Sequence, residues 1–184
     1  MRRGFKSEAN WYSRDFRTSM DLQKHAPLNP FELANHLGIP CIPVSDLSLT
    51  EEHGAFFSSR EGTKAFSAVT IFDGKMKRIV FNDYAPINRQ HSDVAHEISH
   101  VVLNHDMLPT SELYTGNHYN QNDEFEAKWM GPALLISEEA AMYVGANYTC
   151  FTSASADYNV TIDVMRMRIN VCGVKKRLKL KMLA

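Results

Sequence analysis

A helical spacing of histidines is the first chemical feature of the chain. The apolar run from Val94 to His105 contains His96, Glu97 and His100. On a helix, residues four apart project from one face, so the two imidazole rings can bind one zinc ion at about 2.0–2.1 Å. Glu97 follows His96 by one residue and so lies beside that face. From there its carboxylate does not readily reach the metal as a third ligand. It can instead accept a hydrogen bond from a water on the metal.

This H-E-x-x-H spacing suits the hydrolysis of a peptide bond. Zinc lowers the pKa of its water towards 7 and polarises a carbonyl, while a carboxylate takes the proton of that water and passes it to the leaving amine. The alternative is a buried helix with a polar face, although eight histidines in 184 residues make a chance match rare. The pattern therefore predicts one Zn²⁺ ion, with Glu97 as general base.

A third metal ligand is expected on a helix further along the chain. Glu124 and Glu126 are two residues apart and so point to nearly opposite faces. Ala127, Met130 and Leu134 form an apolar stripe whose edge includes Glu126, and a carboxylate at such an edge needs a cation. We therefore predict Glu126 as the third ligand and keep Glu124 in reserve.

Two residues that follow the histidine pair are weaker candidates. Asp106 occupies the third-ligand position of an extended zinc-protease pattern, but Leu103 stands where that pattern has a glycine, so Asp106 is a minor candidate. His105 is five residues beyond His100, about 140° around the helix. It is predicted to cap the helix or to face solvent.

The first half of the chain has clear start and stop signals for its elements. Asn29 can cap a helix that begins at Pro30, with Glu32 completing a capping box and Gly38 ending it. The other elements expected are a helix over 7–20, a proline-containing edge strand over 39–44, a loop or weak strand over 51–63, and hairpin strands over 65–72 and 77–81 around Asp73-Gly74.

The second half is predicted to be helical. Ser92 or Asp93 can cap the helix that carries the histidines. A loop of roughly 17 residues follows it, and loops of that length are usually functional or mobile. The further helices expected are one from about Asp123 that is interrupted at 130–132, one from Ser137 to Ala146, and one from Thr161 to Val171 that ends at Gly173.

Charge, cysteine spacing and the length of apolar runs indicate which classes of protein the chain does not resemble. The net charge is −1, and the three cysteines lack metal-knuckle spacing. No apolar run reaches the roughly 18 residues of a membrane span, and the N-terminal residues lack a signal-peptide core. We expect a cytoplasmic protein with no membrane or direct nucleic-acid partner. The basic residues from Lys175 to Lys181 are interpreted as a solvated end.

The stretch from Ile79 to Leu135 resembles the ImmA/IrrE family of bacterial and phage metallopeptidases. Like that family, it has a strand that ends in Asn, an Arg-Gln pair before A-H-E-x-x-H, and later E-x-E-A followed by Leu-Leu. The resemblance implies an α+β, zincin-like single domain, in which a small antiparallel sheet packs against the active-site helix. It also implies zinc held by two helix histidines and a downstream glutamate, and cleavage of a helix-turn-helix transcriptional repressor.

We expect one metallopeptidase domain over 1–184, since no linker or repeat divides the chain. Its parts are N-terminal helices and an edge strand over 1–50, the hairpin and zinc-site core over 65–136, and C-terminal helices over 137–184.

Four other residues are candidates for contacts with substrate or with the oxyanion. Arg89 precedes the histidine helix and could steer a substrate carboxylate, although a structural pair with Asp83 or Asp93 is the stronger interpretation. The other three lie in the long loop, where a Tyr or His could stabilise an oxyanion: Tyr114, His118 and Tyr119.

The main hypothesis is a zinc-dependent endopeptidase that acts on a protein substrate such as a repressor. The first alternative is a non-catalytic binding module that keeps the fold and sequesters a repressor or toxin. A weaker alternative is DNA binding by the helix from Thr161 to Val171 through Arg166 and Arg168, which the absence of a broad basic face argues against.

Overall fold

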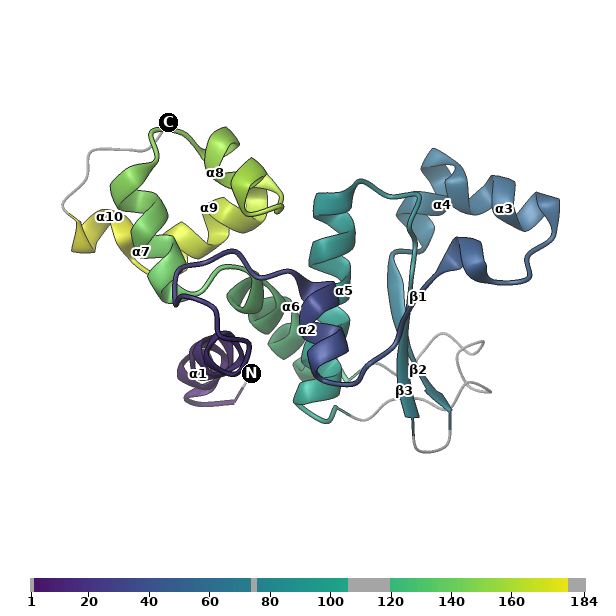
Figure 1. The fold of residues 1–184 in the computed structure, drawn as a ribbon, viewed down its shortest axis with the longest axis horizontal. Helices are drawn as coiled ribbons and strands as arrows, with labels where there is room; N and C mark the ends of the chain where they lie inside the picture. The colour runs from purple at the N-terminus through teal and green to yellow at the C-terminus, as the bar shows by residue number, and fades with distance from the viewer. Residues whose placement is uncertain (1, 74–75, 106–119, 179–184) are drawn as a thin grey trace.

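The computed structural model describes residues 2–73, 76–105 and 120–178. It has an α+β fold, as predicted, with a three-stranded sheet and helices on both sides of the central pair α5 (Ile87–Val102) and α6 (Gln121–Leu135) (Figure 1). The sheet lies at one end of the molecule with α3 (Glu51–Ser58) and α4 (Arg60–Ala65), and the helices between 138 and 177 lie at the other. In the described part of the chain, no helix is both long and apolar enough to span a membrane.

The sheet contains β1 (Cys41–Pro43), β2 (Ala68–Asp73) and β3 (Met76–Phe81) in the order β1-β3-β2. The predicted hairpin is confirmed, since β2 and β3 pair in antiparallel fashion from Ala68 opposite Phe81 to Asp73 opposite Met76. The predicted edge strand is also confirmed. However, β1 runs parallel to β3, so the sheet is mixed and not purely antiparallel as expected.

The first two helices follow their predicted signals. They are α1 (Phe5–Ser19) and α2 (Pro30–His36). The Asn29 side chain accepts a hydrogen bond from the Phe31 amide at 2.9 Å, which satisfies one of the free N–H groups at the start of α2. Gly38 follows the helix with a φ of 69°, a left-handed conformation that glycine adopts without strain.

The prediction of a loop or weak strand over 51–63 is wrong. The chain forms α3 (Glu51–Ser58) and α4 (Arg60–Ala65) there. Thr50 caps α3 by accepting from the His53 amide, and Ser59 caps α4 by accepting from the Gly62 amide. None of the α3 residues is buried. The helix therefore lacks the periodic buried apolar positions by which a helix is recognised from a sequence.

Helix α5 (Ile87–Val102) begins earlier than predicted. Pro86 occupies the N-cap position, and Ser92, one of the predicted caps, instead donates to the Asn88 carbonyl inside the helix at 3.0 Å. The side chain of Gln90 donates to two carbonyls of the preceding loop, which fixes the path from β3 into α5. The start of α5 is therefore set by a proline and by loop contacts.

Helix α6 (Gln121–Leu135) continues through Pro132 without the predicted interruption. Gly131 faces α5 so closely that a Cβ atom there would lie 3.1 Å from the backbone nitrogen of His96. Since glycine has no side chain, α6 can approach α5 at the turn that carries this histidine. The two helices thus form one unit, with His96 and His100 on the one and Glu124 on the other.

Two apolar cores lie on either side of this unit. The first joins α1, α2, the sheet, α5 and α6, and includes the fully buried Phe5, Leu33 and Ile98. The second joins the end of α6 to the C-terminal helices, which are α7 (Glu138–Asn147), α8 (Phe151–Asp157), α9 (Ile162–Val171) and α10 (Val174–Arg177). The predicted helices starting after Ser137 and Thr161 are confirmed with both caps, whereas α8 was not predicted.

Buried His91 on α5 should make stability depend on pH. Its ring is 5% exposed and lies edge-on to Phe31, and burial lowers the pKa of His91 below its usual 6.5. A depressed pKa means that the contribution of His91 to stability is present above about pH 6.5 and is lost as pH falls through the folded-state pKa. We expect His91→Phe to reduce the loss of unfolding free energy between pH 7 and pH 5.

Urea denaturation at several pH values tests this expectation. Replacing the exposed His53 with Phe is the control, because an exposed ring changes environment little on folding. An unchanged pH slope in His91→Phe would contradict the assignment.

Candidate metal centre and active site

Three side chains place metal-binding atoms together between α5 and α6. The Nε2 atoms of His96 and His100 are 3.0 Å apart, and the Glu124 carboxylate lies 3.2 Å from His100 Nε2 and 3.6 Å from His96 Nε2. The donor atoms of the three residues all lie within 4.8 Å of one another. Ligand atoms around a tetrahedral zinc ion with bonds of about 2.0–2.1 Å are about 3.3 Å apart, so this donor set fits zinc.

The structure places Glu124, and not Glu126, beside the two histidines. Glu126 is buried and directed away from them, where its carboxylate accepts from the backbone amide of Arg2 at 2.9 Å and from Arg2 Nε at 3.0–3.1 Å. The cation that Glu126 needs is therefore a guanidinium. The geometry therefore differs from the prediction of Glu126 as third ligand, because the carboxylate that lies beside the two histidines is that of Glu124, the reserve candidate.

Glu97 is half-buried and directly follows His96 on α5. Its Oε2 accepts a hydrogen bond from the Thr70 hydroxyl on β2 at 2.7 Å. Burial raises the pKa of Glu97 to about 7, and the bond from Thr70 only partly opposes this shift. A carboxyl group poised near neutrality can both accept and return a proton, which is the property of a general acid–base group. Thr70 was not predicted from the sequence.

The two histidines are held in the neutral form that metal binding requires. Burial lowers the pKa of His96, with Glu124 partly opposing the shift. Burial and the neighbouring histidines lower the pKa of His100 to about 3. Neutral imidazoles keep a lone pair free for an ion, so these rings need no proton release at neutral pH to coordinate one.

Arg89 forms the structural pair that the sequence favoured. Its Nε lies 3.5 Å from the Asp93 carboxylate, one turn along α5. Burial raises the pKa of Asp93 to about 6, with Arg89 opposing the shift. Four other candidates lie outside the described residues: Asp106, Tyr114, His118 and Tyr119.

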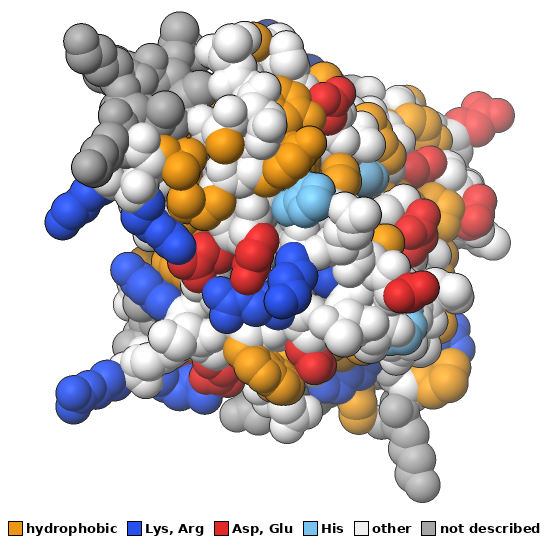
Figure 2. Space-filling view, turned by 60° about the vertical axis from the view of Figure 1, so that its left-hand side comes forward, with side chains coloured by type: hydrophobic (Ala, Val, Ile, Leu, Met, Phe, Trp, Pro, Cys, Tyr) orange, Lys and Arg blue, Asp and Glu red, His pale blue; other side chains and the backbone are white. Residues whose placement is uncertain are grey.

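One of the two arginines considered for DNA binding is buried in the protein. Arg168 is fully buried and donates to the Ile136 carbonyl at 2.8 Å and to Asn10 at 2.9 Å. Arg166 pairs with Asp163 at 3.2 Å. Figure 2 shows Lys and Arg side chains beside Asp and Glu side chains, with no uniform basic surface on the face in view.

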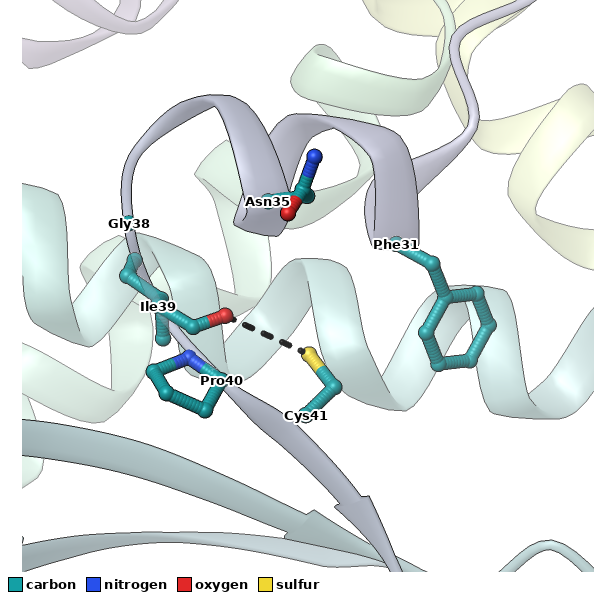
Figure 3. Close-up of a pocket in the computed structure, with 6 residues that line it drawn as sticks. All are labelled: Phe31, Asn35, Gly38, Ile39, Pro40 and Cys41. Atoms are coloured by element: carbon teal, nitrogen blue, oxygen red, sulfur yellow. Dashed lines mark hydrogen bonds between the residues drawn. The ribbon is translucent and has the colours of Figure 1, made fainter.

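Two cavities differ in their relation to the site. A cavity of about 170 Å³ adjoins His96 between α5, α6 and α9, and is lined by Ser92, Asp93, His96, Lys128, Pro132, Leu135 and Val164. A larger one of about 490 Å³ lies between α2 and β1 (Figure 3), and is lined by Phe31, Asn35, Gly38, Ile39, Pro40 and Cys41. Burial raises the pKa of the Cys41 thiol to about 11, so the larger cavity offers no thiolate nucleophile.

Comparison with known proteins agrees with this geometry. A search of curated proteins found no match to the chain. The family model described as the IrrE N-terminal-like domain, Peptidase_M78, matches residues 41–170, a span that runs from β1 to α9 and includes all of α5 and α6. A match over most of the chain, centred on the helices that gather two histidines and a glutamate, places the chain in the IrrE N-terminal-like family of metallopeptidases.

Proposed function

We propose that this metallopeptidase-family protein is a zinc-dependent endopeptidase in which Glu97 is the general base. The observation that carries the proposal is the convergence of the metal-binding atoms of His96, His100 and Glu124, with Glu97 next to His96 in the sequence and held by Thr70. These three residues would hold one zinc ion. When bound there, zinc would supply a Lewis acid that polarises the scissile carbonyl and activates the attacking water.

The side chains of the protein would move the protons of the reaction. Thr70 donates to Oε2 of Glu97, and this bond orients the carboxyl group. We assign Oε1 of Glu97 to the proton transfer: it takes a proton from the attacking water and delivers it to the leaving amine nitrogen. The raised pKa of Glu97 favours the second step, since a protonated carboxyl group is then accessible at neutral pH.

The outer edge of β2 is the proposed place for the substrate backbone. Among the described strands, β2 lies at an edge of the sheet and carries Thr70, so a peptide paired along it would pass the Glu97 carboxyl. The opposite edge is formed by β1, which is only three residues long and ends in Pro43, a residue without an N–H group. An extended substrate would therefore pair with β2, next to the proposed active site, and not with β1 at the other edge of the sheet.

A helix-turn-helix repressor is the proposed substrate. Support comes from the resemblance of the segment from Ile79 to Leu135 to ImmA/IrrE proteins, whose known role is the cleavage of such repressors. The burial of Arg168 is consistent with a protein that acts on a DNA-binding partner and does not itself bind DNA through α9. A non-catalytic module that only sequesters the repressor is the competing function.

A cleavage assay with the repressor encoded beside this protein tests the proposal. We expect one zinc ion per chain by metal analysis and cleavage at a defined bond by mass spectrometry. Removal of metal with a chelator should abolish cleavage, and added zinc should restore it. A wild-type protein that takes up no zinc would contradict the metal site. Tight binding of an intact repressor by zinc-loaded protein would favour the non-catalytic module.

A further inference from the structure

We propose that His105 is a positioning residue for the metal site: it accepts a hydrogen bond from His100, and its other ring nitrogen faces the Glu126 carboxylate, which Arg2 holds in place. The Nδ1 atoms of His105 and His100 are 3.0 Å apart, on the side of the His100 ring opposite the proposed zinc site. The inference rests on the proposed function only in taking His100 as a zinc ligand. It assigns a role to a residue that the sequence placed at a helix cap or in solvent.

The end of α5 explains how His105 reaches this position. Asn104 adopts a left-handed conformation with a φ of 51° directly after Leu103, the C-cap residue. The His105 amide then donates to the His100 carbonyl at 3.1 Å, and the Asn104 amide donates to the Val101 carbonyl at 3.2 Å. These two bonds define a Schellman motif, which turns the chain back over the last helical turn. The side chain of His105 is thereby only 7% exposed.

The hydrogen-bond directions follow from the proposed zinc coordination. If Nε2 of His100 binds zinc, its Nδ1 carries the hydrogen and donates to Nδ1 of His105. His105 must then carry its own hydrogen on Nε2. That atom is buried, lies 3.7 Å from the Glu126 carboxylate and 3.9 Å from that of Asp123, and has no hydrogen-bond partner at normal distance within the described residues. A carboxylate at this end favours the required tautomer.

Glu126 is held by the N-terminal Arg2. Its carboxylate accepts hydrogen bonds from both the backbone amide and the guanidinium of Arg2, at 2.9 Å and at 3.0–3.1 Å. The order of contacts is therefore Arg2, Glu126, His105 and His100. The negative charge of Glu126 is paired with Arg2, so the series can orient the His100 ring without an unpaired charge beside it.

Partners behind a metal ligand typically change metal affinity by about 10- to 100-fold when they are removed. We therefore expect His105→Phe to weaken zinc binding by about 10- to 100-fold. His105→Gln should restore most of the affinity, because its amide oxygen can accept from His100 and its amide nitrogen can donate to Glu126. Competition between the metal-free protein and a chromophoric chelator for zinc measures these dissociation constants.

The matched control is His91→Phe. His91 is another buried histidine of α5, but its ring contacts Phe31. The control should bind zinc as the wild type does, which separates the loss of the His105 contact from the general loss of a buried imidazole. Equal zinc affinity of His105→Phe and the wild type would overturn the inference, as would a failure of His105→Gln to recover affinity while it folds normally.

A second measurement is independent of zinc and of cleavage. Long-range ¹H–¹⁵N correlation spectra of the metal-free protein report which ring nitrogen of His105 carries hydrogen. We expect the Nε2–H tautomer in the wild type, and a larger fraction of the Nδ1–H tautomer in Glu126→Gln. A dominant Nδ1–H tautomer in the wild type would overturn the inference. Zinc affinity and the His105 tautomer are both measured without substrate. These results can therefore support the role of His105 even if the protein cleaves no repressor.

Discussion

Replacing Glu97 with Gln is expected to lower the rate of cleavage by about 10²- to 10⁴-fold while one zinc ion remains bound. The amide keeps the size of the carboxyl group and can still contact Thr70, which donates to Oε2 of Glu97. It cannot take a proton from water at neutral pH, so the proton transfer to the leaving amine is lost. The histidines and Glu124 are unchanged, and their donor atoms should still gather around the ion.

The comparison requires kcat/KM for the repressor together with the zinc content of each preparation. Glu52→Gln, a change of the same kind on the exposed face of α3, should leave both values unchanged. Cleavage by Glu97→Gln at the wild-type rate would rule out Glu97 as the base. Loss of zinc from this variant would show that the carboxyl group takes part in coordination.

Replacing Arg17 with Met is expected to reduce the free energy of unfolding by about 3–5 kcal/mol. Arg17 is fully buried on α1 and donates to the carbonyls of Leu134 and Leu135 at the end of α6, at 2.9 and 3.0 Å, and to the Ala26 carbonyl at 3.1 Å. Burial lowers the pKa of Arg17 to about 10, so the side chain remains charged at neutral pH. Methionine would leave these buried carbonyls without a donor.

Urea denaturation of both variants checks this value, with Arg14→Met as the control on the same helix. Arg14 is paired with Glu138 and Glu139, but 43% of its side chain is exposed. Exposed ion pairs contribute about 0–1 kcal/mol, so the control should unfold close to the wild type. A similar small change in both variants would show that water or other donors replace the Arg17 contacts.

The sequence predicted the parts of the site that depend on local spacing. His96 and His100 share a helix face because they are four residues apart, and the hairpin followed from alternating strands around a turn signal. The third ligand could not be chosen in this way. The sequence indicated that Glu126 needs a cation, but the cation is Arg2, which lies 124 residues away along the chain. The contact that occupies Glu126 is therefore tertiary, and the local sequence around Glu124 and Glu126 does not reveal it.

Two further residues were missed for different reasons. Thr70 contacts Glu97 across the gap between β2 and α5, and nothing in its local pattern marks that contact. His105 was placed by continuing the period of α5 beyond its end. An asparagine shortly after the last apolar residues is a known stop signal for a helix, so Asn104 could have indicated that the chain turns back before His105. The role of Thr70 can be found only from the folded structure, whereas the position of His105 could have been inferred from the residues that end the helix.

The close contact at Gly131 affects how a mutational scan of this protein would be interpreted. A side chain at this position would displace the backbone of His96, since its Cβ would lie 3.1–3.3 Å from three backbone atoms of Ala95 and His96. A scan that scores only cleavage would therefore rank Gly131 among the functional positions, although glycine has no reactive group. Its sensitivity would report the spacing between two helices, and zinc affinity would distinguish that effect from a loss of chemistry.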